Sequence, residues 1–93
     1  MNDPYAAVWA SVEAAILREP GSLDAASREA IAAGDDPSEL APLLDKVRRH
    51  AYRIVDGDLA GIDDDVALEA VLAAALGAAD TRRRAALAAL ERA

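Results

Sequence analysis

Residues 68–79, LEAVLAAALGAA, decide the fold class of this chain. Leucine recurs every fourth residue at Leu68, Leu72 and Leu76, which is the spacing of one face of an α-helix. Most of the residues between these leucines are alanine, the strongest helix former. The segment therefore predicts a helix, and the sequence leaves open whether residues 64–92 form one helix or two.

Helical periodicity extends over the rest of the chain. Asp3 and Pro4 are typical of a helix start, and the stripe that follows contains Tyr5, Val8, Trp9, Val12 and Ile16. A second, short helix is expected to begin after Ser22 or Asp24 and to end at Gly34, and a third to run from Pro42 to about Val55. We therefore predict one all-α domain over residues 1–93, a compact bundle of four to five helices.

Composition and charge exclude several classes of function. The 93 residues include 25 alanines, one histidine and no cysteine, which excludes disulfides, thiolate metal sites and thiol nucleophiles. The net charge of −7 disfavours nucleic acid and anionic membranes as partners. No signal peptide or apolar span of membrane length is recognised, so a cytoplasmic location is expected.

Several segments together resemble a known superfamily. They are PGSLD at 20–24, REAI at 28–31, DKVRRHAYRIV at 45–55, LEAV at 68–71 and AAALGAA at 73–79. The chain resembles the alkylhydroperoxidase D-like, or carboxymuconolactone decarboxylase-like, superfamily in a shortened and cysteine-less form. The resemblance implies a compact helical domain that assembles into dimers or rings. The peroxidase branch uses a Cys-x-x-Cys motif followed by a histidine, so the absence of cysteine excludes thiol peroxidase activity here.

His50 is the candidate catalytic residue. On a continuous helix it would share the apolar face of Leu43, Val47 and Ile54, where its imidazole could transfer protons near neutral pH. In a decarboxylase-like enzyme, an arginine at position 48, 49 or 53 would hold an anionic substrate. The alternative is a boundary histidine bound to a backbone carbonyl or water, and we favour this non-catalytic interpretation.

Two basic clusters are candidate anion-binding sites. One contains Arg48, Arg49 and Arg53 with Lys46, and Tyr52 beside them could stack on a base. The other is Arg82–Arg84. The nearby Asp45, Asp56 and Asp80 can neutralise these arginines, so a solvated or subunit-bridging face is favoured over an anion- or nucleic-acid-binding module.

No cofactor and no metal are expected from the sequence. The acidic segment 56–64 resembles a calcium loop, but Ala60 and Ala67 stand where two of its ligands are required. Helix capping accounts for these aspartates instead.

Small and apolar residues after Asp63 indicate an interface. Gly77 and Ala74 allow a close helix crossing, either within the domain or between subunits. The expected interface residues are Leu68, Leu72, Ala74, Gly77, Leu87 and Leu90. The leading hypothesis is a non-redox oligomeric assembly or binding module, with a second copy or a helical protein as partner. The enzyme interpretation stays open beside it.

Overall fold

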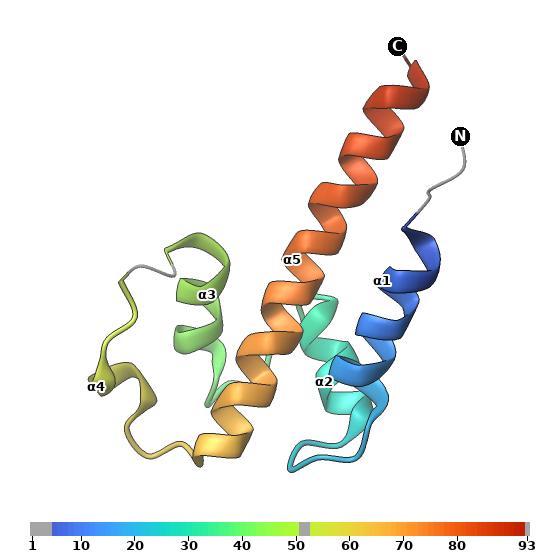
Figure 1. Ribbon diagram of the computed structural model, residues 1–93. Coiled ribbons are helices and arrows are strands. Elements are labelled where there is room, and N and C mark those ends of the chain that lie inside the picture. Colours follow the sequence, from blue (N-terminus) through green and yellow to red (C-terminus); the bar gives the residue numbers. More distant parts are fainter. Residues whose placement is uncertain (1–4, 51–52, 93) are drawn as a thin grey trace.

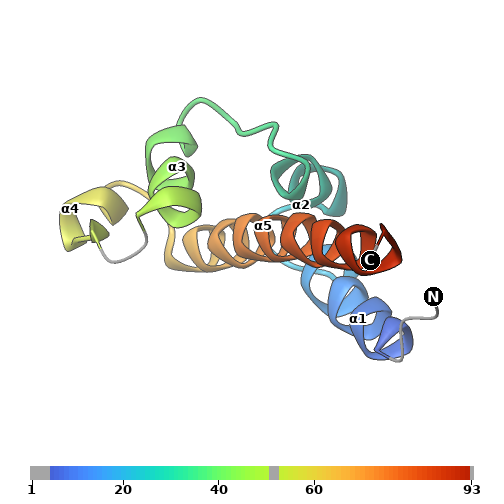
Figure 2. The same cartoon turned by 90° about the horizontal axis from the view of Figure 1, so that it is seen from above.

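The fold is all-α, as the sequence predicts (Figure 1). The computed structural model describes residues 5–50 and 53–92, and it contains no strand within those ranges. The elements are α1 (Ala6–Glu13), the π-helical η1 (Ala14–Arg18), α2 (Ala25–Ala32), α3 (Ala41–Arg49), α4 (Asp56–Leu59) and α5 (Asp64–Arg92). The α5 helix runs the length of the molecule. The α1 and α2 helices lie on one side of it, and α3 and α4 lie on the other side, toward its N-terminal end (Figures 1 and 2).

Residues 64–92 form one helix of 29 residues. Its start is capped by Asp63, whose Oδ2 accepts hydrogen bonds from the backbone N–H groups of Asp65 and Val66. The Asp80–Thr81 pair does not begin a new helix, since both residues lie within α5, where the Thr81 hydroxyl donates to the carbonyl of Gly77 one turn back. At about 1.5 Å per residue, α5 accounts for most of the 46 Å longest dimension of the molecule.

The core lies between α5, α2 and α3. Four buried residues on one side of α5 are alanines, which let the neighbouring helices come close. Larger side chains from the neighbouring elements fill the space against them, with Ile31 and Leu44 fully buried. The buried α5 residues are Ala67, Ala70, Ala73, Ala74 and Leu76.

Gly77 lies where α5 crosses α2. A Cβ atom built at this position would stand 2.1 Å from the carbonyl oxygen of Ala32. Ala74, one turn earlier, is fully buried in the same core. The sequence left open whether Gly77 and Ala74 serve a crossing within the domain or between subunits, and the structure shows the crossing within the chain.

The first helix differs from its predicted stripe. Trp9 and Ile16 of the predicted stripe pack against the core, but Tyr5, Val8 and Val12 are exposed, and the buried residue is Leu17, which the stripe did not include. The cause is η1, where the backbone bonds span five residues, as in the bond from the Glu19 N–H to the Ala14 carbonyl. The wider turn shifts the phase of the side chains and brings Leu17 inward. The predicted start at Asp3 and Pro4 lies outside the described residues.

The connection from α2 to α3 follows the sequence signals. Asp24 caps α2 through its bond with the Ser27 N–H, and Gly34 with φ of +95° follows its last turn. A single turn joins Pro37 to Ala41, whose N–H donates to the Pro37 carbonyl. The predicted third helix is too long, however, because α3 ends at Arg49 and His50 leaves the helical conformation (φ −144°, ψ 53°).

We expect Gly77→Ala to destabilise the fold by about 1–3 kcal/mol, because an added methyl group must push the α2 backbone away. Urea unfolding followed by circular dichroism measures this change. Gly57→Ala is the matched control, since a Cβ there meets no atom within 4 Å. Equal stability of the two variants would contradict the close crossing.

Candidate functional site

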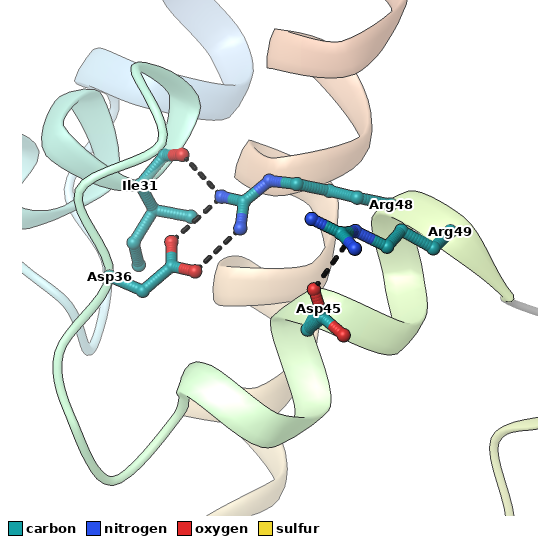
Figure 3. Close-up of polar contacts among 5 residues, drawn as sticks. All are labelled: Ile31, Asp36, Asp45, Arg48 and Arg49. Carbon is teal, nitrogen blue, oxygen red and sulfur yellow. Dashed lines mark hydrogen bonds and ion pairs between the residues drawn. The ribbon is translucent and has the colours of Figure 1, made fainter.

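Arg48 is a structural residue that ties α3 to the end of α2 (Figure 3). Its guanidinium binds both carboxylate oxygens of Asp36, with Nη2 2.7 Å from Oδ1, and Nη2 also donates to the Ile31 carbonyl at 2.8 Å. The hydrogen bond to Asp36 raises the pKa of Arg48 above its ordinary value. The predicted anion-binding role is not supported at Arg48, because its donors face a carboxylate of the same chain.

The other two arginines of this cluster lie apart from that ion pair. The guanidinium of Arg49 turns toward Asp45 at 3.2 Å, one helical turn back, as the sequence predicts (Figure 3). Both of these side chains are largely exposed. Arg53 follows the end of α3 and is exposed, and Tyr52 lies outside the described residues. Arg48 and Arg49 are thus paired with acids of the same chain.

His50 occupies the C-terminal cap of α3 and is exposed. The helix ends one residue earlier than this histidine, so His50 does not share the apolar face that includes Leu43. Its carbonyl accepts a hydrogen bond from the Arg53 N–H. The imidazole is exposed, whereas a histidine that transfers protons to a bound substrate is expected to line an enclosed pocket. The position of His50 therefore agrees better with the non-catalytic interpretation.

Asp58 and Lys46 join the acidic connection to α3. The Lys46 ammonium lies 2.8 and 2.9 Å from the two Asp58 carboxylate oxygens, and the Val55 N–H donates to the same carboxylate. The hydrogen bond from Lys46 is the main cause that lowers the pKa of Asp58. In residues 5–50 and 53–92, no three Asp, Glu or His side chains gather closely enough to hold a metal ion.

The second basic cluster connects α5 with α1. Arg83 lies over the ring of Trp9, 5.0 Å from its centroid, and also bonds to Asp80. Arg84 pairs with the other Asp80 oxygen at 2.9 Å. The predicted neutralisation by Asp80 is confirmed for these two arginines.

Arg28 is a buried cation that the sequence analysis did not single out. It is 3% exposed, and its guanidinium donates to the carbonyls of Ile16, at 2.9 Å, and Glu19. These carbonyls end the π-helical η1, so Arg28 acts as its C-terminal cap. The available signal was its position three residues before Ile31, which places both on the buried side of α2.

The outward side of α5 is an apolar surface that the fold leaves open. It contains exposed residues at alternating spacings of four and three, opposite the buried alanines. We call this set the outer stripe: Leu68, Leu72, Ala75, Ala79, Arg82, Ala86 and Ala89, with Leu90 at its edge. Three of the predicted interface residues, Leu68, Leu72 and Leu90, are exposed here, while Leu87 is half-buried.

A groove borders the first turns of the outer stripe. It has a volume of about 310 Å³ and lies between α3, α4 and α5. Its walls are almost entirely apolar and include Leu43, Ile54, Leu59, Leu68 and Val71. Leu68 therefore belongs to a wider apolar surface than the stripe alone.

Comparison with known proteins gives no relative from which to assign a function. No protein-family model, curated protein or solved structure matches this chain. Across the part of the chain that the structure describes, no helix combines the length and the hydropathy needed to cross a membrane.

We expect Arg48→Lys to destabilise the fold by about 1–2 kcal/mol, because an ammonium group cannot reproduce the two-pronged bond to Asp36 and the bond to Ile31. Arg49→Lys is the matched control, since its exposed pair with Asp45 tolerates either cation. Thermal unfolding compares the two variants. A larger loss in Arg49→Lys would contradict the role of Arg48.

The Lys46–Asp58 pair predicts a specific acid dependence. Because the folded-state pKa of Asp58 is lowered, its contribution to stability is complete above the ordinary aspartate value of about 3.9 and disappears as the pH falls through the folded value. The difference in unfolding free energy between the wild type and Asp58→Asn should therefore shrink as the pH is lowered from 5 through the ordinary aspartate pKa and below it. Urea unfolding at a series of pH values measures it, and Lys46→Met should reduce the same dependence without abolishing it, because the Val55 N–H still donates to Asp58. A difference that stays constant with pH would show that the pair does not shift this carboxyl group.

Proposed function

We propose that this chain is a non-redox helical assembly module that self-associates through the outer stripe of α5. The observation that carries the proposal is the exposure of Leu68 (59%) and Leu90 (55%) on the side of α5 that faces away from its own core. Leucines at both ends of one exposed helix side form a surface that gains stability when covered.

The size of this gain supports reversible association. Covering a half-exposed leucine contributes roughly 1 kcal/mol, so Leu68, Leu72 and Leu90 of two copies together contribute about 6 kcal/mol before the cost of association. The alanines between them add contact area at close range. Because the cost of association is itself about 4–15 kcal/mol, we expect a weak assembly that depends on protein concentration.

The composition of the core also supports assembly. Four of the five buried residues of α5 are alanines, which bury little apolar area each. A domain of this size hides only about 60% of the surface of its unfolded chain. Association of folded copies stabilises them by mass action, because the unfolded chain does not bind.

We also infer a relationship to the alkylhydroperoxidase D-like superfamily, in a cysteine-less form located in the cytoplasm. Support comes from the all-helical fold and from three of the resembling segments, which lie on helices: REAI at 28–31 on α2, and LEAV at 68–71 and AAALGAA at 73–79 on α5. The decarboxylase-like alternative requires His50 and an arginine around one substrate. The exposed His50 and the pairing of Arg48 with Asp36 give that alternative less support.

We expect Leu68→Glu to raise the dissociation constant of the assembly at least about tenfold, because it places a charge in the buried centre of the interface. The fold should stay intact, since the Leu68 side chain is largely exposed in the single chain. Sedimentation equilibrium measures the association, and circular dichroism checks the helical content.

Val55→Glu is the matched control for this test. Val55 is 62% exposed and lies outside α5, so the same added charge should leave the association unchanged. A wild-type chain that remains a folded monomer at millimolar concentration would overturn the proposed function.

A further inference from the structure

We propose that a second copy of this chain packs antiparallel along the outer stripe, so that the two α5 helices cross about a two-fold axis near Ala79. This inference rests on the proposed function and specifies its partner and geometry. It follows from three properties of α5: the spacing of the stripe, its symmetry about Ala79 and its distribution of charge.

The spacing of the outer stripe fits helix-to-helix packing along its full length. Steps of four and three residues alternate from Leu68 through Ala75 to Ala89, and every one of these positions is exposed in the single chain. This is the seven-residue repeat by which two helices keep one seam in contact. The small residues in the middle of the stripe let the two backbones approach closely.

The stripe is complementary to itself only when the helices run in opposite directions. Leu68 and Leu90 each lie eleven residues from Ala79, on opposite sides of it. An antiparallel pair centred there places each Leu68 beside the Leu90 of the second copy, and both leucines become covered. A symmetric contact of this kind closes on itself as a dimer.

The charges of α5 select the same direction. Asp63, Asp64 and Asp65 lie at its start, while Arg82 and Arg92 lie in its second half and are exposed. A parallel pair would place these aspartates beside their own copies, and the arginines likewise. An antiparallel pair brings Arg92 of one helix to the acidic first turn of the other, and it also opposes the two helix dipoles.

Arg82 is compatible with this packing although it interrupts the apolar stripe. It lies three residues from Ala79, so it faces the partner helix near Ala75. Its aliphatic stem can cover that alanine while the guanidinium group remains in water.

Distances between spin labels test the direction of the helices. The chain contains no cysteine, so Thr81→Cys and Ala89→Cys each provide one labelling site, and both positions are exposed. At about 1.5 Å per residue, antiparallel packing about Ala79 separates the two labels along the axis by about 6 Å at position 81 and about 30 Å at position 89. The inter-chain distance should therefore be clearly longer for the Ala89→Cys dimer.

The possible outcomes separate this inference from the proposed function. A dimer with equal distances at the two sites would indicate parallel helices, and a dimer with long distances at both would place the contact elsewhere. Either result overturns the antiparallel arrangement and keeps self-association. A protein that stays monomeric in sedimentation, with no dipolar coupling between labels, overturns both.

A charge reversal tests the same geometry without labels. Arg92→Glu should weaken dimerisation about tenfold at low salt, because it places like charges together at both ends of the pair. Adding Asp64→Arg should restore the dissociation constant to within about threefold of the wild type. Weakening without rescue would overturn the pairing of these two ends.

Discussion

The close approach of α2 and α5 at Gly77 is the constraint on which the rest of the structure depends. The Ala32 carbonyl occupies the space that any side chain at position 77 would need, so the two helix backbones are in direct contact. This contact lets the alanines of α5 lie against Ile31 and Leu44, the largest fully buried side chains in residues 5–50 and 53–92. With so few large residues in the chain, a wider crossing would leave cavities that no side chain could fill.

Charged side chains hold the outer elements against this centre. Arg28 joins α2 to the end of η1, Arg48 joins α3 to the segment after α2, and Lys46 joins α3 to α4. Each of these cations meets a different acceptor, so the basic residues are distributed among separate structural contacts. Arg48 and Lys46, which belong to one basic cluster of the sequence, are therefore each held by an acid of the same chain.

Local sequence signals predicted the helices well and their contacts less well. The Asp24 cap, the glycine at 34 and the Asp45–Arg49 pair all act over one turn, and all three are confirmed. The side on which His50 lies was predicted wrongly because it depends on where α3 ends, and the sequence could not choose between the two crossings left open for Ala74 because that choice depends on which side of α5 meets α2. Both depend on tertiary packing. In an alanine-rich helix with apolar residues on every side, the sequence pattern does not indicate which side is buried.

The π-helical turn at Ala14–Arg18 determines which side of α1 faces the core. An extra residue in a helical turn rotates everything before it by about 100° relative to everything after it. The side of α1 that meets the core is thus set by this wider turn, and removing one residue there would rotate α1 by about 100° relative to the core. Among related chains, a change in length at this turn would matter more for the surface of α1 than most substitutions within it.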